Sequence, residues 1–418
     1  MLAKIVKYLS LVFLIAVCLV GCGDKKDKKT NYASQLKLER EYEGKTFLND
    51  GIEVVTLLNK VDGDTAHFTL QSGEAIKIRF LGIDTPESTG NIEPYGLAAS
   101  KFTSDRLESA SSIIIESNDS KANPDSTGTR YLAFVWYRTS ESKDYICLNL
   151  EILQEGYSKA KSAGDTKYGD ILTKAAAQAN ELELALWSGE KDPEFWYDDP
   201  LSVNLKILRE SAKDYFLKKV TFTAVVTRID GETIYVQEEV NGQAYGFQVY
   251  KAFLQTRKLE IGNKVRISGF VSYYETGDVY QIVGIKDVAL SDAIDNLKVI
   301  ERNCTITPIV ETAESLNNKT AGLATLVKLE NVVVKSTYTT KTGNSAGAIT
   351  ITGEINGQAV TIRTIVMFDL TGEYLVDETN KILASNFTNK TIDVVGIVDY
   401  YEGNYQIKLT QMSDVVFK

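Results

Sequence analysis

The chain has 418 residues and a formal net charge of -10, and 44% of its residues are hydrophobic. At roughly 100 to 200 residues per domain, this length predicts two to four domains, with ample apolar material for their cores. The acidic balance argues against a broad basic surface for nucleic acid. The sole histidine, His67, excludes chemistry that needs a histidine pair or a histidine-rich zinc site. Carboxylate and arginine chemistry remain.

The N-terminal stretch, residues 1–22, carries two lysines and then an apolar run that ends at Leu19-Val20-Gly21-Cys22. The run is too short for a spanning helix and predicts a signal peptide. Its end resembles a bacterial lipoprotein box, which implies cleavage before Cys22 and a lipid on Cys22. The alternative is an N-terminal anchor in which Cys22 is incidental. Either way we expect the body of the protein outside the cytoplasm, and the lipobox favours a bacterial cell surface with lipid anchoring to the membrane.

After a polar, highly charged segment at 23–45, which predicts a disordered tether, the chain turns to strands. Residues 65–70 and 75–81 are rich in apolar and β-branched side chains, and Gln71-Ser72-Gly73-Glu74 lies between them. This pattern predicts an antiparallel hairpin. A turn centred on Ser72 and Gly73 sets the register of the two strands.

That register places Asp64 opposite Leu81, with Asp84 just beyond it. The alternation of side chains along a strand puts Arg79 on the face opposite to the apolar residues, near both aspartates. Two converging carboxylates with carbonyl oxygens nearby suit a hard divalent cation such as Ca²⁺. Glu87, three residues further on, is within reach of a water beside that cation.

Each of these motifs also has a purely structural interpretation. Asp62-Gly63 is a common turn pair, and Asp84-Thr85-Pro86-Glu87 suits a loop because the residue before proline is disfavoured in helices. Their combination, in this order and spacing, is much more specific than either motif alone.

The combined pattern resembles the staphylococcal nuclease (thermonuclease) family. The matching stretches are V-D-G-D-T at 61–65, I-R-F-L-G-I-D-T-P-E at 78–87 and Y-G-L-A-A at 95–99. Further matches follow in order at 129–136, 148–159 and 185–188. The resemblance covers about residues 48–190. It implies a small five-stranded oligonucleotide-binding (OB) barrel with three helices.

The resemblance also implies Ca²⁺-dependent hydrolysis of phosphodiester bonds in DNA, RNA or both, leaving 3′-phosphate ends. It assigns cation binding to the carboxylates of Asp64 and Asp84 and to the carbonyl of Thr85. It assigns the water-activating role to Glu87, and phosphate binding and charge stabilisation to Arg79 and Arg130. Further candidates for substrate contact are Tyr95, Lys159, Lys161 and Tyr168, each with a surface or packing role as the alternative.

Two places depart from the family pattern. The family has tyrosine and glycine directly before the second arginine, whereas here Gly128-Thr129 precede Arg130 and the tyrosine is missing. The alternative for Arg130 is an arginine that covers the end of a strand. The tyrosines that flank the nucleotide in the family have no match, since Ser162 and Ala163 occupy their place.

The remaining elements of this region follow from periodicity. Helical spacing predicts helices at 97–110, 149–155 and 171–187, and β-rich runs predict strands at 113–115 and 131–137. Cys147 and Cys304 are two distant cysteines, so we expect no disulfide framework and interpret each as a small buried residue.

Beyond an acidic, proline-bearing junction at 192–201, residues 202–217 include a candidate helix, and strand-like runs predominate after it. The run G-F-V-S-Y-Y-E at 269–275 recurs as G-I-V-D-Y-Y-E at 396–402, and Y-Q-I follows each copy. The recurrence predicts a duplicated all-β domain, and it resembles OB-like domains appended to some bacterial surface nucleases. The paired tyrosines either stack nucleic-acid bases or pack within their hairpins.

The sequence thus predicts a mainly β protein with an α+β first domain and two repeated OB-like barrels. The expected parts are a lipoprotein signal (1–22), a tether (23–45), a staphylococcal-nuclease-like domain (46–190), a linker (191–217), a first OB-like domain (218–292), a linker (293–324) and a second OB-like domain (325–418). The expected function is a surface-anchored nuclease acting on DNA or RNA with no protein partner. The alternative is a non-catalytic nucleic-acid-binding or scaffold lipoprotein.

Overall fold

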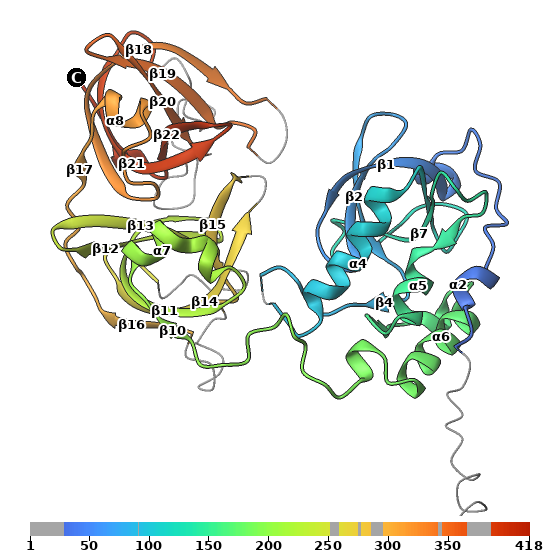
Figure 1. Cartoon of the computed structure of the whole chain (residues 1–418). Coiled ribbons are helices and arrows are strands. Elements are labelled where there is room, and N and C mark those ends of the chain that lie inside the picture. The colour runs from blue at the N-terminus through green and yellow to red at the C-terminus, as the bar shows by residue number, and fades with distance from the viewer. Residues whose placement is uncertain are drawn as a thin grey trace, which may run out of the picture. The chain divides into compact units, whose positions relative to one another are not determined.

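The computed structural model describes residues 29–90, 92–250, 259–274, 277–285, 296–341, 345–365 and 386–418 (Figure 1). The expected signal peptide and the lipidation site Cys22 lie outside the described residues. None of the helices within these ranges is long and apolar enough to cross a membrane. The chain divides into two units: the first holds residues up to Thr85 together with Ala99–Glu190, and the second holds Pro86–Ala98 together with Lys191–Lys418.

The first unit is built on a five-stranded barrel of β1 (Ile52–Lys60), β2 (Thr65–Thr69), β3 (Ala75–Phe80), β5 (Ser112–Glu116) and β7 (Tyr131–Arg138). Strand β1 pairs antiparallel with β2 and β5, and the barrel closes where β3 runs parallel to β7. Short strands are β4 (Ile83–Asp84), β6 (Asn123–Pro124), β8 (Ile146–Cys147) and β9 (Lys159–Ala160).

Helices surround this barrel. They are α2 (Tyr32–Gln35), α3 (Phe47–Asp50), α4 (Gly96–Ser109), α5 (Leu148–Gln154) and α6 (Gly169–Glu181), with 3₁₀ turns η1 (Ala163–Asp165) and η2 (Ala185–Trp187). The helix expected over 171–187 ends at Glu181, because Glu183 and Ala185 adopt positive φ angles of 52° and 43°. Left-handed residues of this kind do not continue a right-handed helix.

The hairpin of β2 and β3 has the predicted faces. Ile76, Ile78 and Phe80 are buried in the core. Lys77 and Arg79 point to the other side. The register differs by one residue from the prediction, because Thr65 pairs with Arg79 and the N–H of Phe80 donates to the Asp64 carbonyl. Asp64 therefore lies opposite Phe80 rather than Leu81, since the turn centres on Ser72 alone.

Residues 29–45 contact the first unit, in contrast to the expected disordered tether. Ala33 is buried and its N–H donates to Gln154 Oε1 at 3.0 Å. Lys29 Nζ lies 2.6 Å from Glu155 Oε2. Tyr32, Leu36, Leu38 and Tyr42 pack on the core. Spaced apolar residues in a charged segment are enough to hold it against α5.

The second unit contains two further barrels. The first consists of β11 (Lys219–Asp230), β12 (Thr233–Val240), β13 (Gln243–Tyr250), β14 (Lys264–Tyr274) and β15 (Val279–Val283). The second consists of β18 (Leu326–Thr339), β19 (Ile349–Ile355), β20 (Gln358–Thr364), β21 (Thr391–Tyr401) and β22 (Asn404–Leu409). In all three barrels the first strand pairs with the second and fourth, and the third runs parallel to the fifth. This shared five-stranded Greek-key connectivity is of the OB type and confirms the predicted fold class.

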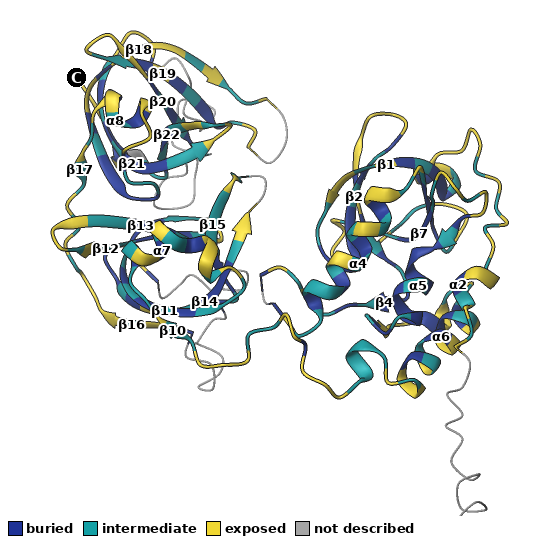
Figure 2. Cartoon of the chain, viewed as in Figure 1, coloured by how far each residue is buried: buried dark blue, intermediate teal, exposed yellow. Residues whose placement is uncertain are grey.

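The segments expected as linkers carry ordered elements. They contain β10 (Leu201–Ser202), α7 (Leu205–Ser211) and η3 (Ala212–Tyr215) before the first barrel, and β16 (Leu297–Glu301), β17 (Ile309–Val310) and α8 (Ala313–Asn317) before the second. Strands β10 and β17 pair parallel with the first strand of each barrel. Figure 2 shows buried residues along both barrels, and the helices add Leu205, Leu208, Ala313 and Leu316 to their cores. The repeated unit thus begins with a strand and a helix. Short elements η8 (Met412–Asp414) and β23 (Val415–Phe417) complete the second barrel.

The sequence repeat has a steric basis at its glycine. A Cβ added to Gly269 would lie 2.5 Å from Ile282 Cγ2, and a Cβ added to Gly396 would lie 2.6 Å from Ile407 Cγ2. The two isoleucines are the last residues of the repeated Y-Q-I stretches. The glycine in each copy lets the fourth and fifth strands approach at the same point of the barrel.

Candidate active site

Three of the predicted site residues meet at one end of the first barrel. Asp64 directly precedes β2, Arg79 lies in β3 and Asp84 ends β4. Arg79 Nη2 lies 2.7 Å from Asp64 Oδ2 and 2.5 Å from Asp84 Oδ1. One guanidinium nitrogen therefore joins both carboxylates, as the hairpin spacing predicted.

Asp64 is the most buried member of this group, with 1% of its surface exposed. The N–H of Thr85 donates to Asp64 Oδ2 at 2.9 Å, and Thr65 Oγ1 donates to Asp64 Oδ1 at 3.1 Å. Burial, followed by the charge of Asp62, raises the pKa of Asp64 to about 7 against the opposing effect of Arg79. Two hydrogen bonds and the ion pair with Arg79 thus hold this buried carboxylate in place.

Asp62, which the sequence indicated only as part of a turn, is a member of the site. It is 7% exposed, and its Oδ1 accepts a hydrogen bond from the N–H of Asp64 at 3.1 Å. The signal was present in the D-G-D spacing, since two carboxylates separated by one glycine in a tight turn stay close together. The site therefore holds three carboxylates, two in contact with Arg79 and the third hydrogen-bonded to the backbone of Asp64.

Lys161 brings a second cation to Asp84. Strand β9 pairs with β4 so that Lys159 lies opposite Asp84, but it is Lys161 Nζ that lies 3.0 Å from Asp84 Oδ1. The side chain of Lys161 is 61% exposed. Lys159 is also exposed. Of the two lysines named as substrate candidates, Lys161 has the direct contact with the site.

Tyr168 has the packing role that was weighed against substrate contact. Its hydroxyl donates to Glu116 Oε2 at 3.1 Å, and its ring packs edge-on against Phe134 and Trp136. Burial, with the nearby charge of Glu116, raises the pKa of the Tyr168 hydroxyl above its usual range.

Arg130 directly precedes β7 and is held by its own loop. Leu132 of β7 pairs with Arg79 of β3, so Arg130 comes two residues before the strand partner of Arg79. Arg130 Nε donates to Asp125 Oδ2 at 2.8 Å. Burial raises the pKa of Asp125, but hydrogen bonds from Thr127 and Arg130 outweigh it and lower that pKa to about 2. In this structure Arg130 covers the start of β7. This packing role is the one that was weighed against phosphate binding.

Glu87 and Tyr95 belong to the segment Pro86–Ala98, which is part of the second unit. The N–H of Glu87 donates to Glu93 Oε2 at 3.2 Å, and the N–H of Tyr95 donates to Asp192 Oδ2 at 2.6 Å. Glu87 follows Asp84 by only three residues along the chain. The roles assigned to these two side chains stay predictions.

The donor chemistry of the site fits a hard divalent cation. No set of three or more histidine, cysteine, aspartate or glutamate side chains within the described ranges has the arrangement of a metal site. However, Arg79 holds oxygens of Asp64 and Asp84 within hydrogen-bond distance of one nitrogen, and carboxylate oxygens are the ligands that Ca²⁺ takes. Asp64 and Asp84 are therefore the residues that would hold it, with water completing the shell.

Comparison with known proteins supports the predicted family of the first domain. Residues 77–189 match the family described as "Staphylococcal nuclease homologue". The chain contains a staphylococcal nuclease domain. It is also 27% identical over 212 residues to the uncharacterized protein MJ1439 of Methanocaldococcus jannaschii, a match that covers 44% of this chain and 94% of that protein. The staphylococcal nuclease domain places this part of the chain in a family of nuclease-type hydrolases that bind nucleic acid.

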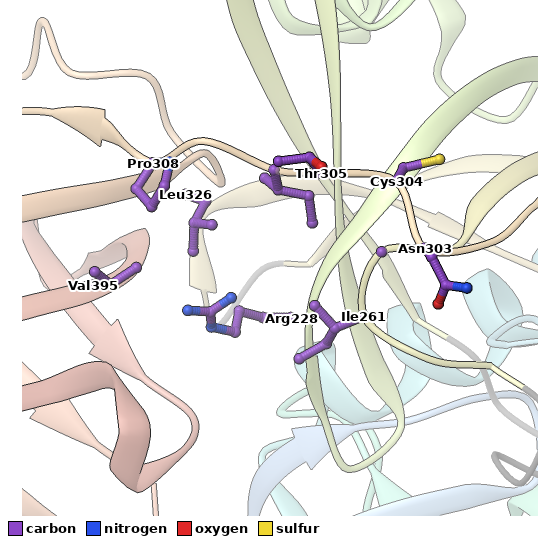
Figure 3. Close-up of a pocket in the computed structure, with 10 residues that line it drawn as sticks. Arg228, Ile261, Asn303, Cys304, Thr305, Pro308, Leu326 and Val395 are labelled. Atoms are coloured by element: carbon purple, nitrogen blue, oxygen red, sulfur yellow. The ribbon is translucent and has the colours of Figure 1, made fainter.

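A separate pocket of about 330 Å³ lies in the second unit, between the two barrels (Figure 3). Arg228 projects into it, and its lining includes Ile261, Cys304, Leu326 and Val395. The guanidinium donates to Asp414 Oδ1 at 2.5 Å and to the Thr227 carbonyl at 2.7 Å. Arg228 is thus paired within the protein, and the pocket offers little reactive chemistry.

The two cysteines of the described chain are both free thiols. Cys147 is fully buried, as predicted, and burial raises its pKa to about 12. Cys304 is half-buried at the edge of the pocket in the second unit.

The repeated tyrosines divide between packing and exposure. Tyr273 pairs with Tyr280 across its hairpin, with ring centroids 5.0 Å apart, and Tyr400 pairs with Tyr405 at 6.1 Å. Their neighbours Tyr274 and Tyr401 are 46% and 58% exposed. Tyr273 is itself 37% exposed, so both tyrosines of the first copy face solvent while Tyr273 also contacts Tyr280, whereas Tyr400 in the second copy is half-buried.

Proposed function

We propose that the staphylococcal nuclease domain is a Ca²⁺-dependent phosphodiesterase that cleaves DNA, RNA or both and leaves 3′-phosphate ends. The observation that carries this proposal is the cluster in which Arg79 contacts both Asp64 and Asp84. A pure scaffold has no use for a buried carboxylate whose pKa is raised to about 7. Perturbed groups of this kind are typical of functional sites.

In this proposal the residues of the chain divide the work. A bound Ca²⁺ would neutralise charge on the phosphate and lower the pKa of a water molecule. Asp64 and Asp84 would hold that cation, with the Thr85 carbonyl as an additional ligand. Arg79 then turns from its carboxylates to the phosphate, where its planar fork matches two oxygens.

Two further residues complete the proposed reaction. Glu87 orients the attacking water or takes its proton. Arg130 leaves Asp125 to stabilise the charge that develops on the phosphate, because phosphoryl transfer depends mainly on positioning and electrostatics. Tyr95 and Lys159 remain proposed substrate contacts.

The competing function is non-catalytic binding of nucleic acid. One observation favours it, since Arg79 and Lys161 already neutralise Asp84 from two sides. The two functions predict different results in one experiment.

The experiment uses residues 24–418 and measures hydrolysis of single-stranded DNA and of RNA, with Ca²⁺ or with a chelator. Glu87→Gln removes the proposed base, and Glu74→Gln in the exposed hairpin loop is the matched control. Ca²⁺-dependent cleavage that falls by about 10² to 10⁴-fold in Glu87→Gln alone supports the enzyme, since general-base catalysis contributes this much. Nucleic-acid binding without cleavage by the folded protein would leave the binding function as the better conclusion.

We further propose that Cys22 carries a lipid that anchors the protein to the membrane outside the cytoplasm. A single chain gives only marginal membrane binding, so stable anchoring requires more than one acyl group. Labelling with a fatty-acid analogue in a bacterial host tests this. Cys22→Ser is expected to abolish the label and release the protein from membranes, whereas Cys304→Ser retains both properties.

A further inference from the structure

Aromatic side chains gather on one hairpin of the first barrel in the second unit. Tyr273 pairs with Tyr280 across the β14–β15 hairpin, two residues beyond the buried pair of Val271 and Ile282. Because side chains alternate along a strand, the two tyrosines continue the core-facing row of this hairpin into solvent. Phe216 extends the group, with its ring centroid 6.5 Å from that of Tyr280.

The second barrel repeats this arrangement. Tyr400 pairs with Tyr405 across the β21–β22 hairpin, two residues beyond the buried pair of Val398 and Ile407. Lys319 Nζ lies 5.8 Å from the ring centroid of Tyr400. The sequence repeat is therefore also a repeat of surface, since each hairpin presents a tyrosine pair at the same place on its barrel.

One carboxylate connects the two groups of rings. Asp278 accepts a hydrogen bond from the hydroxyl of Tyr273 in its own hairpin. Desolvation, followed by a hydrogen bond to Asp278, raises the pKa of Tyr400 in the other barrel. The tyrosines of the two barrels are therefore within reach of one side chain. We call the set formed by Phe216, Tyr273, Tyr280, Tyr400 and Tyr405 the aromatic band.

Buried contacts between the barrels fix the two halves of the aromatic band relative to one another. Tyr235 of the first barrel forms a buried cluster with Ala324, which precedes β18, and with Leu326 and Ile397 of the second barrel. A Cβ added to Gly246 of β13 would lie 2.2 Å from the Ala324 carbonyl carbon, so the backbones approach closely there. The band is thus one preformed surface, which reduces the ordering that a ligand must cause on binding.

The aromatic band is accessible and suited to flat rings. Phe216 is 44% exposed, and Tyr273 is exposed as well. Exposed aromatic rings bind the bases of single-stranded nucleic acid by stacking, which needs no sequence-specific hydrogen bonds. The same chain contains a staphylococcal nuclease domain, and the family of this domain acts on nucleic acid. A single strand is therefore the ligand that both the rings and the neighbouring domain favour.

The charge around the aromatic band favours bases over phosphates as the groups that are recognised. Residues 191–418 contain more acidic than basic side chains, and Asp278 lies within the band. Lys319 is exposed beside Tyr400, where it can meet a phosphate. A strand on such a surface gains more from stacking than from neutralised phosphates.

We propose that the aromatic band of the two C-terminal barrels binds single-stranded DNA or RNA, with bases stacked on Phe216, Tyr273 and Tyr400. The inference rests on the proposed function only for the class of ligand, because it adds a second place on the chain at which the substrate strand binds. The site lies wholly within the second unit and contains none of the residues proposed for hydrolysis. Binding and hydrolysis are therefore measured separately.

The first test measures the binding of a fluorescent oligothymidylate to residues 24–418 by anisotropy in a chelator, with the strand shown intact on a gel. Tyr273→Ala and Tyr400→Ala should each weaken binding by about 5- to 100-fold, as loss of one stacking ring does. Tyr273→Phe and Tyr400→Phe keep the ring and should bind within about twofold of wild type. Tyr338→Ala, at a tyrosine that is 59% exposed outside the band, is the control and should bind like wild type.

A second test changes the ligand and leaves the protein intact. A strand of abasic sites keeps the phosphates but lacks the bases, and it should bind at least about tenfold more weakly than oligothymidylate. If Lys319 meets one phosphate, the slope of log affinity against log salt should be about −0.7 for oligothymidylate. Lys319→Gln should bring this slope close to zero.

The outcomes separate the inference from the proposed function. Base-dependent binding that Tyr273→Ala and Tyr400→Ala weaken would support the inference even if the protein cleaves no strand. Unchanged binding in both variants would overturn it even if the nuclease domain cleaves as proposed. Equal binding of the two strands with a salt slope steeper than about −3 would overturn it too, because phosphates would then be the recognised groups. Tighter binding of a neutral probe, cellohexaose, would assign the band to glycans instead.

Discussion

The nuclease barrel and the two C-terminal barrels share one connectivity but place their ion pairs differently. In the nuclease barrel, Arg79 joins two carboxylates at the end of the strands, where Asp84 is 41% exposed. In the second unit, Arg228 and Asp414 form a pair across the two barrels, with side chains 7% and 1% exposed. The first pair is accessible to a ligand and the second is not. The same fold therefore supports chemistry or assembly according to where its charges lie.

The surroundings of the two pairs reinforce this contrast. Asp414 also accepts from the N–H groups of Thr410 and Gln411, and Arg228 donates to a backbone carbonyl. For Asp64, in comparison, burial followed by the nearby charge of Asp62 raises the pKa to about 7. Charged side chains whose hydrogen bonds are all made within the protein, such as Arg228 and Asp414, stabilise an interface. A carboxylate whose charge is only partly compensated is suited to bind a cation.

The largest expected effect is at Arg79. Arg79→Gln should lower hydrolysis by about 10³-fold or more, as loss of an arginine that stabilises a transferring phosphoryl group does. The same variant should bind Ca²⁺ more tightly in calorimetry, because Asp64 and Asp84 lose a competing cation. Lys77→Gln, exposed on the same side of β3, is the control and should change neither quantity. More than a tenth of wild-type activity in Arg79→Gln would contradict the assigned role.

The second prediction concerns the paired arginine of the barrel interface. Arg228→Met leaves Asp414 buried without its partner, which typically costs about 3–5 kcal/mol. We expect a lower unfolding midpoint of the second unit in denaturant, with hydrolysis unchanged at temperatures where the protein is folded. The double variant Arg228→Met with Asp414→Leu should regain most of the stability. A loss of activity in the folded single variant would show that this pair has a catalytic influence.

The third prediction uses the repeated glycines. Gly269→Ala and Gly396→Ala each force a methyl group against the isoleucine on the neighbouring strand, and overpacking of this kind costs about 1–3 kcal/mol. The two costs should be similar if the barrels are true structural repeats. Gly164→Ala, where nothing lies within 4 Å, is the control. Chemical denaturation followed by tyrosine and tryptophan fluorescence measures all three, and a large difference between the two copies would break the equivalence.

The sequence predicted the parts of the site that depend on local spacing. Alternation along β3 placed Arg79 outward, and the five-residue step to Asp84 brought both to one end of the hairpin. It missed features that depend on distant packing. Ile92 is one apolar residue in a polar loop, and nothing nearby in the chain indicates that Phe270 covers it.

Helix α8 was missed for a related reason. It has five residues, too few for a periodic pattern to stand out from its surroundings. Its stability comes from burying Leu316 in the barrel, which no local propensity reveals. Helix α7, in contrast, lies within the candidate helix at 202–217. The one-residue register error has a local origin, since the backbone geometry of the turn at Ser72 decided it.

The smallest expected effect is at Lys161, the exposed cation beside Asp84. Its side chain is 61% exposed, and exposed ion pairs have small, salt-dependent effects. In the proposed reaction its ammonium is released from Asp84 when a cation binds there, and it then attracts the phosphate. Lys161→Ala should raise KM by about two- to fivefold at low salt and by less at high salt, with kcat unchanged. Lys159→Ala, at the proposed substrate contact that pairs with Asp84, is the comparison variant. An equal effect of both variants would mean that the general positive charge of residues 159–161 matters. An effect on kcat for Lys161 alone would place it among the groups that act on the transition state.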